Sequence, residues 1–214
     1  MMEKKTLIIV DVQNDFINPE WGKLYVPKGE EVVYEIIKYI RENSDELREV
    51  IFTLDWHPNV DSVFTEPEVT WPKHCLEFSE GAAIPHELIN VCVDCNIPMK
   101  FFIKGNDTVI DPTHTEYGAF EYIGATGKWA IFNGEKVFKA SNRIGNSYVW
   151  LHPEDEFVVC GVAGDYCVMN TIKNLQKYND EKLKITPFLE GIRSIDGGEK
   201  LQKFIESEFK KDEH

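Results

Sequence analysis

A cysteine in a strand–turn–helix pattern is the first candidate for chemistry in this sequence. The apolar run Glu156–Cys160 is typical of a buried strand, and Val168, Ile172 and Leu175 follow it at helical spacing. Cys167 therefore lies where a helix begins. The free N–H groups and partial positive charge of a helix N-terminus stabilise a thiolate, lower the pKa of a cysteine and can hold an oxyanion. The simpler alternative is that Cys167 is one more small buried hydrophobe.

Two charged side chains follow other apolar strands. Asp11 comes directly after the apolar run 6–10, and Lys104 follows the run 98–103. Catalytic groups of open α/β sheets gather beyond the carboxyl ends of strands, so both side chains are well placed to meet Cys167. An ammonium would favour the thiolate, and a carboxylate could move a proton from the thiol to a leaving amine. Together these groups predict amide or ester hydrolysis. Taken alone, Asp11 could be a turn cap and Lys104 could be an exposed surface lysine.

Three further residues have the chemistry of metal ligands. Asp55 and His57 follow another apolar strand and lie two positions apart, so an extended segment points both to the same side. His74 comes later in the chain, and two imidazoles with one carboxylate suit Zn²⁺ or a similar divalent ion. Glu66 and Glu68 are further candidate ligands or simply solvated charges. The alternative for the whole set is a histidine buried against its own aspartate, or ordinary loop polarity.

The elements that must position these groups alternate between strands and helices. Residues 30–43 form an amphipathic helix, 183–189 a weaker strand and 199–209 a terminal helix. The dipeptide Asn133-Gly134 between two apolar runs predicts a β-hairpin. Strands alternating with helices predict an α/β fold, a three-layer α/β/α arrangement around a mostly parallel, doubly wound, Rossmann-like sheet.

Length, charge and cysteine content narrow the classes of protein. A chain of 214 residues predicts a single domain, 1–214, with a sizeable core. The net charge of -14, without a run of Lys or Arg, argues against a nucleic-acid partner. We find no secretory signal and no apolar run of the about 20 residues that a membrane span needs. The five cysteines predict reduced thiols in the cytoplasm, with the lone Cys92-x-x-Cys95 pair structural.

The motifs together resemble the isochorismatase-like cysteine hydrolases, and within them the nicotinamidase branch. Five motifs carry the resemblance, in the order of the family and over roughly residues 6–192. They are Asp11-Val12-Gln13-Asn14-Asp15-Phe16, Asp55-Trp56-His57-Pro58, Trp71-Pro72-Lys73-His74-Cys75, Lys104-Gly105 and Gly161-Val162-Ala163-Gly164-Asp165-Tyr166-Cys167-Val168.

The resemblance implies that Asp11, Lys104 and Cys167 form a catalytic triad. It also implies that the backbone amides of Ala163 and Cys167 stabilise the oxyanion, and that the peptide bond before Ala163 is cis. Cys167 would attack the carboxamide of nicotinamide to form a thioester. Asp11 would protonate the departing ammonia and activate the water that releases nicotinate. Pyrazinamide is the expected second substrate, and the reaction would serve NAD salvage.

The resemblance further implies how the substrate and a metal are held. Asp55, His57 and His74 would bind the metal, usually zinc, with iron or manganese as alternatives, and the metal would hold the pyridine nitrogen. Phe16 and Trp71 match the aromatic positions that sandwich the ring. The expected partners are a small amide substrate and further copies of the chain in a homo-oligomer.

Several departures from the family pattern bear on the substrate more than on the reaction. Gly164 stands where the family usually has Thr or Ser, and Gly118 where it usually has Ser. Residues 121–150 are predicted to be an atypical insertion that could cap the site, build a subunit interface or reshape substrate choice, and Lys139 is a rival for the ammonium role. The alternatives are a related amidase or hydrolase acting on another small substrate, and a non-catalytic binding or scaffold protein of the same fold.

Overall fold

A five-stranded parallel sheet forms the centre of the computed structural model, which describes residues 4–65, 70–106, 117–123, 129–142, 145–177 and 183–209. The strand order is β3-β2-β1-β8-β9, and every neighbouring pair is parallel. The strands are β1 (Lys5–Val10), β2 (Leu47–Asp55), β3 (Met99–Lys104), β8 (Glu156–Gly161) and β9 (Lys184–Ile192). Since all run the same way, their carboxyl ends share one edge of the sheet.

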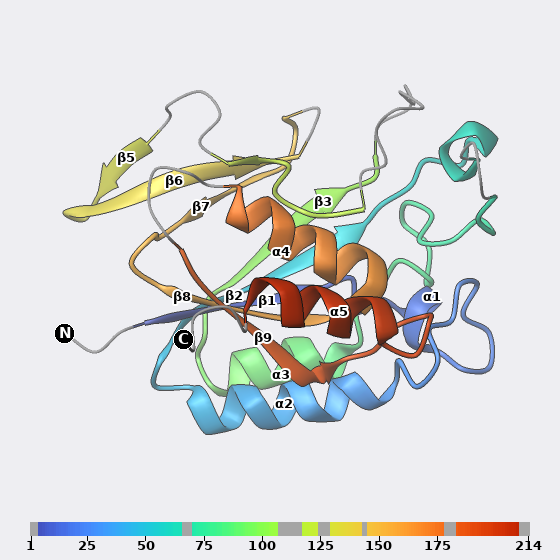
Figure 1. Cartoon of the computed structure of the whole chain (residues 1–214), viewed down its shortest axis with the longest axis horizontal. Coiled ribbons are helices and arrows are strands. Elements are labelled where there is room, and N and C mark those ends of the chain that lie inside the picture. The colour runs from blue at the N-terminus through green and yellow to red at the C-terminus, as the bar shows by residue number, and fades with distance from the viewer. Residues whose placement is uncertain are drawn as a thin grey trace.

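Helices cover both faces of this sheet. Figure 1 shows α2 (Glu31–Asn43) and α3 (His86–Asp94) below the sheet, and α4 (Met169–Gln176) and α5 (Glu199–Glu208) on its other side. The short helix α1 (Asn14–Ile17) follows β1. The three-layer α/β/α fold with a parallel, doubly wound sheet is therefore confirmed. The helix α3 was not predicted from the sequence.

Burial explains the order of the strands. Residues Leu7 to Val10 of β1 are fully buried, as the uninterrupted apolar run predicts for a strand covered on both faces. Strand β1 lies between β2 and β8, so it can be solvent-free along its whole length. In α2, Val32, Ile36 and Ile40 are fully buried and form the stripe that packs on the sheet.

A smaller antiparallel sheet lies beside the main one. It contains β4 (Tyr122–Ile123), β5 (Trp129–Phe132), β6 (Glu135–Ser141) and β7 (Tyr148–Leu151). Strands β5 and β6 pair as a hairpin around Asn133-Gly134, as predicted. Glu135, at the start of β6, binds Arg48 of β2 at 2.9 Å, which ties the hairpin to the main sheet.

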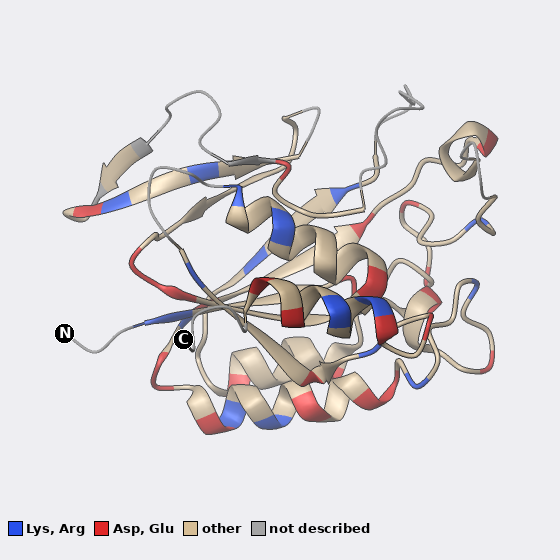
Figure 2. Ribbon diagram, viewed as in Figure 1, with Lys and Arg blue, Asp and Glu red and all other residues tan. Residues whose placement is uncertain are grey.

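Charges of both signs are distributed over the helices. Figure 2 shows acidic and basic residues mixed along α2 and α5, within a chain of net charge -14. Within the described residues, none of the helices combines the length and the apolar character that crossing a membrane requires. Because acidic residues interrupt the basic ones along α2 and α5, neither of these two helices has the continuous basic face that a nucleic-acid partner would need.

Candidate active site

The carboxyl ends of four parallel strands bring the predicted catalytic groups together. Asp11 follows β1, Asp55 and Lys104 are the last residues of β2 and β3, and Cys167 lies in the turn after β8. Asp55 and Lys104 are register partners, so their side chains begin side by side. Ligand-type atoms of Asp11, Asp55 and Cys167 lie within 4.8 Å of one another. One edge of the sheet thus assembles a thiol, an ammonium and two carboxylates.

The Lys104 ammonium connects the other three groups. Its side chain is fully buried, and Nζ lies 2.8 Å from Asp11 Oδ2 and 3.7 Å from Cys167 Sγ, while it also donates to Asp55 Oδ1. Burial alone would lower the pKa of Lys104, but Asp11 and Asp55 outweigh it and raise the pKa well above its ordinary value. The group is therefore a permanent cation beside the sulfur. The rival Lys139 instead lies over the ring of Tyr148, 4.2 Å from its centroid.

Asp11 is held in a strained turn at the end of β1. Its φ of 51° is in the left-handed region, and Thr53 Oγ1 donates to Asp11 Oδ1 at 2.7 Å. Burial raises the pKa of Asp11, and the nearby Lys104 ammonium opposes that rise. A carboxyl group with a raised pKa next to a thiol is suited to accept and return a proton.

The electrostatics of Cys167 differ from the prediction. The strand–turn–helix pattern is present, because β8 leads through a π-helical turn (Gly164–Val168) into α4. However, burial raises the pKa of the Cys167 thiol well above its ordinary value, and Lys104 only partly offsets this because Asp11 and Asp55 add negative charge. The predicted lowered pKa is therefore wrong for this structure. Attack by such a thiol would require a base, and Asp11 is the candidate, because its carboxyl group lies within 4.8 Å of the sulfur.

The backbone before the cysteine presents an unpaired donor. The Val162–Ala163 peptide bond is cis, as the family resemblance implied. The carbonyl of Ala163 accepts from Tyr166 N and Val168 N, both at 3.1 Å. No hydrogen bond is found for the N–H of Ala163 within the part of the chain that the structure describes. This N–H is available to an oxyanion formed near Cys167.

Asp55, His57 and His74 lie together as the sequence predicts. Asp55 Oδ2 is 3.6 Å from His57 Nε2 and 3.8 Å from His74 Nε2. His57 Nδ1 donates to Gly105 O at 2.8 Å and His74 Nδ1 donates to Pro72 O at 2.7 Å, because a carbonyl oxygen can only accept. The Nε2 lone pairs of both rings therefore face the carboxylate.

These distances fit a metal better than hydrogen bonds. Separations of 3.6 and 3.8 Å are too long for hydrogen bonds. Tetrahedral ligands with metal bonds of about 2 Å lie about 3.3 Å apart, which is close to the spacing seen. Burial would raise the pKa of Asp55, but the Lys104 ammonium overcomes it and lowers the pKa well below its ordinary value, so this carboxylate is ionised. The further candidates Glu66 and Glu68 lie outside the described residues.

Aromatic side chains surround the metal-type cluster and the nucleophile. Phe16 is buried, and its ring lies 5.3 Å from that of His74. The half-buried Trp71 contacts Tyr166 edge-on at 5.5 Å and donates from Nε1 to the Tyr117 hydroxyl at 3.4 Å. The predicted Phe16 and Trp71 thus lie near the site, and the sequence reading missed the two tyrosines.

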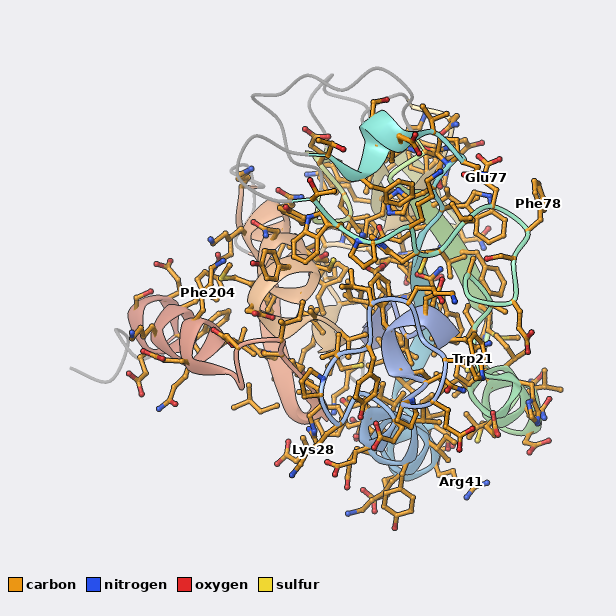
Figure 3. The ribbon with its side chains drawn as sticks, turned by 90° about the vertical axis from the view of Figure 1, so that its right-hand side faces the viewer. Trp21, Lys28, Arg41, Glu77, Phe78 and Phe204 are labelled. Atoms are coloured by element: carbon orange, nitrogen blue, oxygen red, sulfur yellow. The ribbon has the colours of Figure 1, made fainter. Side chains whose placement is uncertain are left out.

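The loop after the second histidine carries an exposed aromatic residue. Phe78 is 88% exposed and projects away from the body of the protein (Figure 3). The edge of its ring contacts Trp56, which lies between the candidate ligands Asp55 and His57. Phe78 therefore contacts Trp56 while most of its own ring stays exposed.

Polar residues that the sequence reading did not single out hold these groups in place. Gln13 is fully buried, donates to Asp55 O at 2.8 Å and accepts from Asp55 N at 2.9 Å. Asp15 accepts from Cys75 N at 2.7 Å, next to His74. The signal was available in the spacing, because Asp11, Gln13 and Asp15 alternate after the end of β1.

The chain is similar to nicotinamidases and pyrazinamidases. Nicotinamidase of Saccharomyces cerevisiae is 29% identical over 191 residues, 78% of this chain and 79% of the relative. The structure of yeast nicotinamidase Pnc1p matches with a TM-score of 0.67 at 26% identity, over 95% of this chain and 94% of that one. A pyrazinamidase of Pyrococcus horikoshii in complex with zinc has the same fold, with a TM-score of 0.60 at 22% identity and coverage of 95% and 93%. No family model matches the sequence. The resemblance predicted from the motifs is confirmed by these relatives.

Proposed function

We propose that this chain, a homologue of nicotinamidases, hydrolyses nicotinamide to nicotinate and ammonia through a thioester on Cys167, and also accepts pyrazinamide. The observation that carries the proposal is the buried Lys104 ammonium, 2.8 Å from Asp11 and 3.7 Å from the Cys167 sulfur. That arrangement directly adjoins a two-histidine, one-carboxylate cluster. Both halves of the site are those that a metal-assisted amidase needs.

The geometry supports the following course of reaction. Asp11 removes the thiol proton as the Cys167 sulfur attacks the carboxamide carbon, and the Lys104 ammonium stabilises the thiolate. The amides of Ala163 and Cys167 stabilise the oxyanion. Asp11 returns the proton to the departing ammonia, and then accepts one from the water that hydrolyses the thioester. The raised pKa of Asp11 suits both transfers.

Asp55, His57 and His74 fit a divalent cation, and we propose zinc, with iron or manganese as alternatives. When bound, the ion supplies a Lewis acid that orients the pyridine nitrogen of the substrate. The chain's own contribution is to fix both imidazoles through Nδ1, so that their Nε2 atoms are free to bind. Phe16 and Trp71 provide apolar surface for the ring.

We further propose that the reaction takes place in the cytoplasm. All five cysteines are free thiols, which suits the reducing cytoplasm and a pathway that recovers nicotinate for NAD. We expect a homo-oligomer, to which the hairpin within residues 121–150 would contribute an interface. Size-exclusion chromatography with light scattering checks the oligomeric state.

The test of the function is release of ammonia from nicotinamide by the purified protein. We expect release that is lost after chelation, restored by zinc and abolished in Cys167→Ala. Cys160→Ala is the matched control, since that thiol is buried in β8 away from the cluster, and it should retain activity. A metal-loaded protein that releases no ammonia from nicotinamide would refute the substrate. Activity on other small amides would then favour the related-hydrolase alternative, and no release of ammonia from any small amide would favour the non-catalytic one.

A further inference from the structure

The glycine that departs from the family pattern lies against a serine of another loop. A Cβ added to Gly164 would lie 2.3 Å from Ser194 Oγ and 2.8 Å from Ile192 Cγ2. The backbone of Gly164 is not in the left-handed region, so its conformation does not demand glycine. The reason for glycine is steric, because the Ser194 hydroxyl occupies the volume that a side chain at position 164 would need.

The serine is held tightly against the turn that carries the nucleophile. Gly164 N donates to Arg193 O at 2.8 Å, and Arg193 N donates to Gly161 O at 3.3 Å. The buried carboxylate of Asp165 accepts from Ile195 N at 3.0 Å and from the next backbone amide at 3.1 Å. These bonds come from both sides of Ser194 in the chain. The loop therefore cannot withdraw without breaking several of them.

A groove borders the serine, and apolar side chains share its lining. Ser194 is 6% exposed, and with Ile192 and Leu201 it lines a groove of about 740 Å³ beside α5. Leu201 Cδ2 is also 3.1 Å from the place of a Cβ on Gly164. Three side chains thus separate the groove from the residue next to the Ala163 amide. In Figure 3, α5 lies outside α4, with Phe204 labelled on α5.

We propose that Ser194 is a positioning residue of the nucleophile turn, and that its hydroxyl, which fills the space beside Gly164, supports that turn from a different loop. Its packing against Gly164 sets the direction of the Ala163 amide and the place of Cys167. The proposal rests on the proposed function for its kinetic readout. The contact between Ser194 and Gly164 involves none of the residues that we assign to the substrate or the metal.

Three variants test the pair by a double-mutant cycle: Gly164→Ala, Ser194→Ala and both together. Removing one oxyanion donor typically costs about 10²–10³ in kcat, so we expect Gly164→Ala to lower kcat about 100-fold with KM within about twofold. Ser194→Ala should lower kcat about 3–10-fold, since it removes support and adds no clash. The double variant should recover at least about tenfold relative to Gly164→Ala, because the 2.3 Å clash is gone. Ser194→Thr, which keeps the hydroxyl, should stay within about threefold of wild type.

The same variants carry a readout that does not need nicotinamide. The rate at which iodoacetamide alkylates the Cys167 peptide, followed by mass spectrometry, should change in the same order as kcat. If the wild type releases no ammonia from nicotinamide but the alkylation rates of the variants still fall in the expected order, nicotinamide is refuted as the substrate and the role of Ser194 is retained. Additive losses in kcat, or a fall in Tm without a change in kcat or alkylation, would refute the pairing. If Gly164→Ala does not fold, Ser194→Ala against Ser194→Thr decides, and equal kcat for the two would overturn the proposal.

Discussion

Replacing Lys104 with methionine is expected to destabilise the native state by about 3–5 kcal/mol, the cost of leaving buried charge without its partner. At 2.8 Å, one pair of unit charges in a medium of effective dielectric about 20 attracts by about 6 kcal/mol, before desolvation is subtracted. Lys104 serves two carboxylates, Asp11 and Asp55, both almost fully buried. Methionine has similar volume, so the cavity contribution is small and the loss reports on charge.

The loss should depend on pH in a defined direction. Burial already raises the pKa of Asp11 in the native state, and removing the Lys104 ammonium raises it further. The native state of the variant then binds a proton more readily than the unfolded chain. Its stability is retained below the unfolded pKa of the carboxyl and falls as pH rises through the folded pKa. The destabilisation should therefore be smaller at pH 5 than at pH 8.

Urea unfolding of the chelated protein at both pH values measures this effect. Chelation is needed because an ion bound by Asp55 would itself offset the missing charge. The matched control is Lys139→Met, whose ammonium lies over Tyr148 and should cost about 0.5–1 kcal/mol at either pH. A loss for Lys104→Met below about 1 kcal/mol, equal at both pH values, would show that the buried ion pairs do not hold this edge of the sheet together.

Three further substitutions test the supports of the site. Gly105→Ala would place a Cβ 2.5 Å from His57 Cε1 at a residue whose φ is 69°. The zinc affinity, measured by competition with a chelator, should therefore fall by about 10–100-fold, and an unchanged affinity would exclude His57 as a ligand. Trp71→Ala should raise KM for nicotinamide about tenfold with a smaller change in kcat, as expected for lost stacking, whereas a pure kcat effect would contradict a binding role. Asp15→Ala leaves Cys75 N without its buried acceptor and should cost about 1–3 kcal/mol in thermal unfolding, and a smaller cost would mean that water replaces the carboxylate.

The sequence predicted where the candidate catalytic groups lie because strand ends are a strong local signal. Asp11, Lys104 and Cys167 each follow an apolar run, and parallel strands deliver their ends to one edge. The same reasoning failed for the pKa of Cys167. A helix N-terminus is visible in the sequence, but full burial beside two carboxylates depends on the packing of distant segments.

Two other features could not be predicted from local sequence patterns, because they too depend on the packing of distant segments. The helix α3 (His86–Asp94) has few strong helix signals, and its stability comes from Leu88, Val91 and Cys92 buried against neighbouring elements. The contact of Gly164 with Ser194 joins segments 30 positions apart in the sequence. Only the folded chain shows why glycine stands there.

Asp55 connects the two halves of the site through its two oxygens. Oδ1 binds the Lys104 ammonium, while Oδ2 faces Nε2 of both His57 and His74. Rotation of this carboxylate would disturb the ammonium and the metal-type cluster together, and Gln13 prevents displacement of its backbone by bonding both the N–H and the carbonyl. One side chain therefore contacts both the Lys104 ammonium and the two candidate metal-binding histidines.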